Sequence, residues 1–143
     1  MLFYFLLHIA SYDLWFYITH YFLHQEYLFR TIHHVHHKVR YNKLKWYNTS
    51  DGHIIEHIVQ GFGLFIPCFL YFDFTTWIIS VLFIHVRGYL RHDDRASWLC
   101  GNHHMLHHKY NKCNYSEYYI DKLFGTLYTD RQHYIEMDKE EET

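Results

Sequence analysis

Histidines in three short clusters are the side chains of this sequence best suited to chemistry. The 143-residue chain contains 16 histidines, more than its 13 lysines and arginines together. They stand at H-x-x-x-H spacing in residues 20–24 and at H-x-x-H-H spacing in residues 33–37 and 104–108. Because each residue of a helix turns the chain by about 100°, positions i, i+3 and i+4 lie on one face. Each cluster is therefore predicted to present its imidazoles in one direction.

Imidazoles that converge from three helices predict a metal site. One zinc ion takes three or four protein ligands, so eight imidazoles predict two metal ions with coordination positions left open. Imidazole binds iron, zinc and copper alike, so the ligand type does not name the metal. Asp13 precedes His20 by seven residues and is expected on the same helix face, where its carboxylate would orient an imidazole. The eight predicted ligands are His20, His24, His33, His36, His37, His104, His107 and His108.

Several other classes of site lack their residues in this chain. The sequence contains neither the H-E-x-x-H motif of zinc proteases nor the E-x-x-H motif of ferritin-like carboxylate sites. Gly61 and Gly63 lie in a hydrophobic run without the strand–turn–helix context of a phosphate loop. The net charge of −2 argues against nucleic acid as a partner. Three widely spaced cysteines form no C-x-x-C pair, which favours a reducing compartment.

The elements that must position the clusters are predicted to be helices. Residues 2–24 are mostly apolar and long enough to span a bilayer core. Residues 58–86 contain no lysine or arginine and predict a hydrophobic hairpin that enters and leaves the membrane on one face, with Pro67 bending its first arm. Residues 29–40 and 103–110 have helical spacing, and strand alternation is nowhere sustained. A buried helix pair in a soluble protein is the alternative interpretation of the hairpin.

The predicted fold class is therefore all-α: an integral membrane helical protein with a hydrophobic hairpin and a histidine-rich di-metal helical cap. Basic residues flank the hairpin, from Arg30 to Lys45 before it and from Arg87 to Lys122 after it. By the positive-inside rule, these flanks predict that the cap faces the cytoplasm. Residues 1–135 are predicted to form one domain, followed by an acidic tail at 136–143.

The order of these motifs resembles the fatty acid hydroxylase superfamily, the membrane group that includes sterol desaturases, sterol C4-methyl oxidases and fatty acid 2-hydroxylases. Flanking segments resemble that family as well: Asp13 with Tyr17, HIIEH at 53–57, HVRGY at 85–89 and NYSEYYIDKLFGT at 114–126. The resemblance covers nearly the whole chain. The chain departs from the family pattern at Tyr21, Ile54 and Ser116, where arginine, proline and glycine are usual.

The resemblance implies a di-iron oxygenase that hydroxylates or desaturates a lipid, either a sterol or a fatty acyl chain, and it slightly favours the sterol desaturases. It implies two iron ions, with zinc in their place in a purified form, and O₂ as oxidant. Electrons would come from another protein, such as cytochrome b5 with its reductase. It also implies an integral membrane location, which in a eukaryote would be the endoplasmic reticulum.

The resemblance assigns site residues beyond the three clusters. It makes the eight clustered histidines the metal ligands and His85 a ninth ligand. His53, Asp13, Asn114 and Asp121 are assigned more weakly, as ligands or as residues that support them. Six histidines receive no role, namely His8, His34, His57, His92, His103 and His133.

Two further functions fit the same residues. One is a non-catalytic, histidine-rich membrane protein that binds or transports metal, although a transporter would place its ligands at mid-membrane. The other is an inactive homologue that serves as a scaffold. The chain is shorter than usual members of the superfamily, which also leaves an oligomer open.

Overall fold

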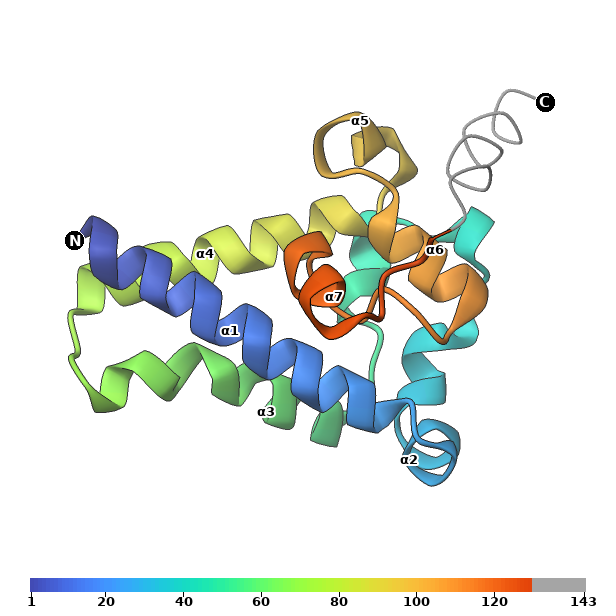
Figure 1. Cartoon of the computed structure of the whole chain (residues 1–143), viewed down its shortest axis with the longest axis horizontal. Coiled ribbons are helices and arrows are strands. Elements are labelled where there is room, and N and C mark those ends of the chain that lie inside the picture. Colours follow the sequence, from blue (N-terminus) through green and yellow to red (C-terminus); the bar gives the residue numbers. More distant parts are fainter. Residues whose placement is uncertain (130–143) are drawn as a thin grey trace.

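The chain folds into long helical arms that run along an elongated molecule and shorter helices that gather at one of its ends (Figure 1). The computed structural model describes residues 1–129, and no strand occurs within them. The all-α prediction is confirmed, whereas the predicted tail at 136–143 lies outside the described residues. The α-helices are α1 (Leu2–Leu23), α2 (Glu26–Thr31), α3 (Ile54–Gly61), α4 (Phe74–Arg91), α5 (Ser97–Cys100), α6 (His103–Tyr110) and α7 (Tyr118–Phe124). The 3₁₀ helices are η1 (His33–Lys38), η2 (Tyr41–Lys43), η3 (Trp46–Ser50), η4 (Phe62–Phe69) and η5 (Asp94–Ala96).

Three arms run along the length of the molecule: α1, the continuous pair α3–η4, and α4 (Figure 1). Helix α1 packs against both other arms. The Trp15 indole N–H donates to the carbonyl oxygen of Val59 at 2.7 Å. A Cβ at Gly63 would lie 2.8 Å from Trp15 Cδ1, so only glycine lets η4 approach α1 this closely. The apolar helix predicted at residues 2–24 is therefore packed between the two arms of the predicted hairpin.

The first arm of the hairpin changes character along its length. It is α-helical to Gly61 and a tighter 3₁₀ helix from Phe62 to Phe69, with Pro67 inside the tighter part. Pro67 has no backbone N–H, so it cannot make the i to i−4 hydrogen bond of an α-helix. The second arm starts at Asp73, whose carboxylate accepts the backbone N–H of Thr76 at 2.8 Å. Among the described residues, no helix has the combined length and apolarity needed to cross a membrane.

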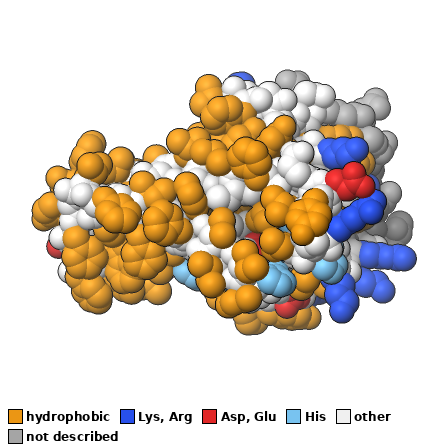
Figure 2. Space-filling model, turned by 90° about the horizontal axis from the view of Figure 1, so that it is seen from below, with side chains coloured by type: hydrophobic (Ala, Val, Ile, Leu, Met, Phe, Trp, Pro, Cys, Tyr) orange, Lys and Arg blue, Asp and Glu red, His pale blue; other side chains and the backbone are white. Residues whose placement is uncertain are grey.

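The two ends of the molecule differ in surface chemistry. Figure 2 shows hydrophobic side chains covering the end formed by the start of α1, η4 and the start of α4, and lysines and arginines gathered at the other end. The exposed hydrophobic residues at the first end include Phe3, Leu6, Phe69, Leu70, Phe74 and Leu82. The short elements η1 and α6, which carry most of the clustered histidines, lie at the other end (Figure 1).

Candidate metal centre

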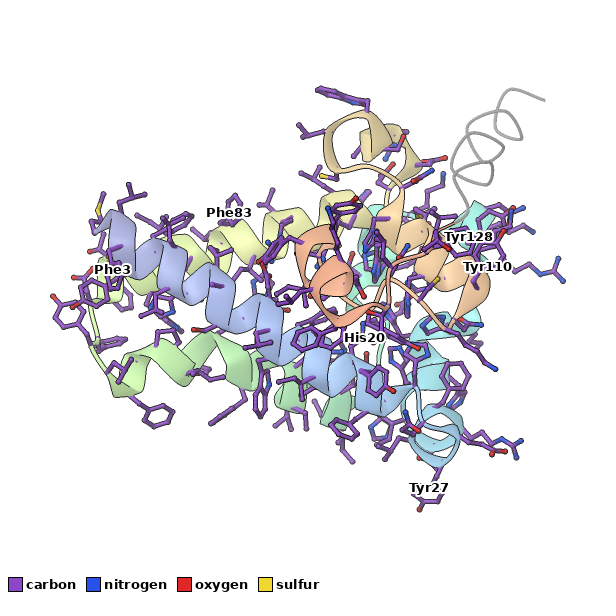
Figure 3. The ribbon with its side chains drawn as sticks, viewed as in Figure 1. Phe3, His20, Tyr27, Phe83, Tyr110 and Tyr128 are labelled. Carbon is purple, nitrogen blue, oxygen red and sulfur yellow. The ribbon has the colours of Figure 1, made fainter. Side chains whose placement is uncertain are left out.

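Nine buried or half-buried imidazoles form two adjacent groups where the short helices meet the ends of α1 and α4. Within each group, one ring nitrogen of every member lies within 4.8 Å of the others. Figure 3 shows His20 at this end of α1, with Phe3 and Phe83 toward the opposite end of the molecule. The first group is His20, His24, His33, His37 and His107, and the second is His36, His92, His104 and His108.

Within each group, the Nε2 atoms of neighbouring imidazoles face one another at short distances. In the first group, His33 Nε2 lies 3.0 Å from that of His20 and 3.1 Å from that of His37. In the second group, His92 Nε2 lies 3.3 Å from that of His36 and 3.1 Å from that of His104. Two nitrogens bound about 2.0–2.1 Å from one ion, at angles of 90–110°, stand about 2.9–3.4 Å apart. The observed spacings match imidazoles that share a metal ion.

Outward hydrogen bonds fix which nitrogen of several rings carries the proton. The Nδ1–H groups of His20 and His107 donate to backbone carbonyl oxygens, at 2.5 and 2.7 Å. Those of His36 and His92 do the same, at 2.8 and 2.9 Å. A carbonyl oxygen only accepts, so the neutral ring must hold its proton on Nδ1 and a lone pair on Nε2.

These lone pairs need a cation. The Nε2 atoms of His36 and His92 point at each other with no proton between them, so the pair is not a hydrogen bond. Protonation does not relieve the contact, because burial lowers the pKa of His33 and His107 to about 3 and that of His36 below its usual value. Neutral, converging, outwardly anchored imidazoles are what a metal ion requires, and iron and zinc both accept this donor set.

The loop before α7 orients imidazoles from two different helices. The carbonyl of Tyr115 accepts from His20 on α1, and that of Cys113 accepts from His107 on α6. The fully buried carboxylate of Asp121 holds this loop by accepting the backbone N–H groups of Tyr115 and Ser116, both at 2.8 Å. Asp121 therefore acts on the ligands through the backbone and lies outside both groups.

Asn114 also supports this loop and is not a member of either group. It adopts a left-handed backbone conformation with φ of 55° and is fully buried. Its Nδ2 donates to the carbonyl of His103 at 3.0 Å, and its Oδ1 accepts the backbone N–H of Tyr128 at 2.7 Å. Asparagine tolerates this conformation better than most residues, which suits it to the tight turn.

Asp13 does not orient an imidazole, contrary to the expectation from its seven-residue spacing. Its buried carboxylate pairs with the guanidinium of Arg87 on α4 and accepts the hydroxyl of Tyr119. Seven residues of α-helix rise about 10.5 Å, so Asp13 shares a face with His20 but lies too far along α1 to reach it. The carboxylate that reaches an imidazole of the two groups is that of Glu56, which stands in the HIIEH segment but was not predicted from the sequence.

Glu56 lies beside the first group from the start of α3. Its Oε1 is 2.9 Å from His33 Nδ1, and both side chains are almost completely buried. Burial raises the pKa of the Glu56 carboxyl to about 7. A carboxylate on the outer nitrogen of a ligating imidazole fixes the ring and increases its basicity.

His85 and His53, expected from the resemblance, lie outside both groups. His85 donates from Nδ1 to the carbonyl of Val81 at 2.8 Å, and His53 begins α3, where its Nδ1 accepts the backbone N–H of Ile55 at 3.2 Å. The residue near the end of α4 that joins the second group is His92, which directly follows α4 and received no role from the sequence. It follows His85 by seven residues, on the same face but two turns closer to α6.

The comparison with known families agrees with this arrangement. The sequence model of the fatty acid hydroxylase family matches residues 5–126. The chain belongs to the fatty acid hydroxylase family. Searches of curated proteins and of solved structures gave no match. Fatty acid hydroxylases are generally oxidoreductases and typically use iron, which the all-imidazole donor set of this member accepts.

A cavity of about 170 Å³ reaches both imidazole groups of this member of the fatty acid hydroxylase family. At one end it is lined by imidazoles of both groups, including His20 and His92. Its walls also include the apolar side chains of Phe16, Leu64 and Ile84. The cavity therefore joins an apolar space to the place where two metal ions would lie.

Proposed function

We propose that this chain is a di-iron lipid oxygenase that hydroxylates or desaturates an acyl chain. The main support for this proposal is the pair of imidazole groups, in each of which neighbouring Nε2 atoms lie 3.0–3.3 Å apart. The membership in the fatty acid hydroxylase family supports the reaction class. When bound, the iron pair supplies an oxidant made from O₂ and two electrons, because side-chain acids and bases do not break unactivated C–H bonds.

The chain itself contributes the binding and orientation of the reactants. Members of the first imidazole group are held by Glu56 and by the loop before α7, so their rings need little rearrangement when a metal binds. The cavity would bring a lipid to the imidazoles that line it. Its volume of about 170 Å³ is below the roughly 300 Å³ at which ligand pockets usually begin. This favours a flexible acyl chain that enters by one end over the fused rings of a sterol, which the resemblance slightly favours.

We also propose that the hydrophobic end of the molecule inserts into a membrane, with the metal centre on the cytoplasmic side. The exposed apolar side chains on the three arms and the absence of lysine and arginine from residues 58–86 support this location. The cations at the opposite end fit the positive-inside rule (Figure 2). In a eukaryote the membrane would be that of the endoplasmic reticulum, and a partner such as cytochrome b5 with its reductase would supply electrons.

Purified full-length protein in detergent micelles tests the proposal. We expect two iron ions per chain and O₂ uptake that depends on added lipid and reductant, with a hydroxylated or desaturated product in the mass spectrum. His107→Ala, which removes an imidazole of the first group, should abolish the product. A single zinc ion with no lipid-dependent O₂ uptake would instead identify a non-catalytic metal-binding protein. In cells, a lipid profile that changes on gene deletion but is restored by His107→Ala would identify an inactive scaffold.

A further inference from the structure

Several residues of the arm formed by α3 and η4 line the cavity. Glu56, Gln60 and Leu64 follow one another at intervals of four residues on this arm, and all three line the cavity. Glu56 contacts His33 of the metal centre, so its level marks the metal end. Leu64 lies about 12 Å further along the arm. Gln60 stands between them, one helical turn from each.

Gln60 presents a hydrogen-bond donor that nothing in the described part of the chain accepts. Its Nε2 is buried, and no protein acceptor lies within hydrogen-bond reach. A buried amide N–H without an acceptor is strongly unfavourable, so such a group needs an explanation. Because Gln60 lines the cavity, an oxygen atom of a molecule inside the cavity is the acceptor that this geometry provides for.

Other polar side chains of the cavity have protein partners for some of their atoms, although Glu56 Oε2, Arg91 Nε and His104 Nδ1 are buried without one. Glu56 is fixed by His33, and Arg91 donates to Glu117 at 2.6 Å. His85 uses Nδ1 on the carbonyl of Val81, and its ring is exposed to water. Gln60 is the neutral amide among these groups, and it lies between Glu56 and Leu64, where its Nε2 can donate to a bound molecule.

We propose that Gln60 selects lipids that carry an oxygen acceptor at the end of the acyl chain, and that it sets which carbons reach the metal centre. This inference rests on the proposed lipid oxygenase function. If each non-hydrogen atom of a ligand occupies about 30 Å³, as a water molecule does, a cavity of about 170 Å³ holds roughly six such atoms. An oxygen held by Gln60 leaves room for about five carbons, so oxidation falls within a few bonds of the polar end and not at mid-chain.

A binding experiment tests Gln60 without any reaction. Zinc-loaded full-length protein, which is redox-inert, is dialysed against radiolabelled dodecanol, dodecanoic acid, dodecanamide or dodecane in one detergent. We expect Gln60→Met to weaken the binding of the preferred oxygen-bearing lipid by about 2- to 12-fold, the effect of one lost hydrogen bond, and to leave dodecane unchanged. The lipid whose binding is weakened most by Gln60→Met identifies the preferred head group. Gln25→Met makes the same exchange at an exposed side chain and should change none of the four constants.

Equal losses for all four lipids, or no loss for any, would overturn the inference and make water the partner of Gln60. Circular dichroism and zinc content establish that each variant is folded. If Gln60→Met does not fold, Gln60→Glu keeps the side-chain shape without the Nε2 donor and should show the same loss.

A second arm uses iron-loaded protein with O₂ and a chemical reductant on the lipid that binds best. We expect products oxidised within about five carbons of the oxygen, and Gln60→Met should raise KM by the same 2- to 12-fold and spread the position of oxidation. Absence of any product from the wild type would refute the proposed function while the binding arm still decides the role of Gln60. An unchanged product distribution in Gln60→Met would refute the role of Gln60 alone.

Discussion

Replacing His92 by alanine should remove one of the two metal ions, whereas replacing His85 should remove neither. His92 shares the second imidazole group with His36, His104 and His108, so the substitution reduces four potential ligands to three. His85 lies on the same helix but donates to the backbone and is exposed. The two variants therefore separate the position indicated by the family resemblance from the position indicated by the geometry.

The size of the effect follows from the number of ligands. Four-ligand zinc sites bind with about 10–16 kcal/mol at neutral pH, or about 2.5–4 kcal/mol for each ligand when shared equally. Loss of His92 should therefore weaken metal binding in the second group by about 10²- to 10³-fold. The first group keeps its five imidazoles and should bind metal as before.

Chelator competition with zinc as the probe measures both affinities, and mass spectrometry of the metals gives the content per chain. We expect two tight sites in the wild type and in His85→Ala, and one tight and one weakened site in His92→Ala. Unfolding curves of the metal-free proteins control for damage to the fold. Two unaltered sites in His92→Ala together with a lost site in His85→Ala would refute the assignment from geometry.

Three further predictions address the surroundings of the ligands. Glu56→Ala should weaken metal binding in the first group by about 10- to 100-fold, as measured by chelator competition, whereas Glu26→Ala on the surface should not. Asp13→Asn removes one of the two carboxylates that pair with Arg87, the other being that of Glu117 at 3.2 Å. It should lower the free energy of unfolding by about 1.5–3 kcal/mol, with unchanged metal content per folded chain. An altered metal ratio would show that Asp13 acts on the ligands. Metal-free protein should become easier to unfold with urea as the pH falls from 6.5 to about 3. Burial lowers the pKa of His33 and His107 to about 3, so the unfolded chain binds protons first, and each imidazole lowers the free energy of unfolding by up to about 1.4 kcal/mol per pH unit. A free energy of unfolding that does not change over this range would contradict the prediction.

Spacing along the sequence indicated which imidazoles meet, but not the helix that presents them. Residues 29–40 were expected to form one α-helix, whereas α2 ends at Thr31 and a 3₁₀ helix begins at His33. Three residues per turn stack His33 above His36 and turn His37 by about 120°. His33 and His37 join the first group and His36 the second. The eight clustered histidines still converge, because neighbours three and four residues apart stay close in either type of helix.

Contacts between elements distant in sequence were the part that spacing did not reveal. Asp13 and Glu56 are both acidic residues near a histidine motif, and only the packing of α1 against α4 and of α3 against η1 decides which one reaches an imidazole. Placing His92 in the second group requires knowing where α4 ends relative to α6, and the sequence does not show this. Membership in the fatty acid hydroxylase family was predictable, since it depends on the order of motifs alone.

The carbonyl acceptors of His20 and His107 have a consequence for the order of assembly. All nine imidazoles of the two groups precede residue 109, whereas the carbonyls of Cys113 and Tyr115 and the carboxylate of Asp121 follow it. A nascent chain can thus display every imidazole while two rings still lack the partners that set their protons and their direction. Synthesis therefore places a delay between making the ligands and fixing them, and a metal ion meets a finished site only after nearly all of the described chain has emerged.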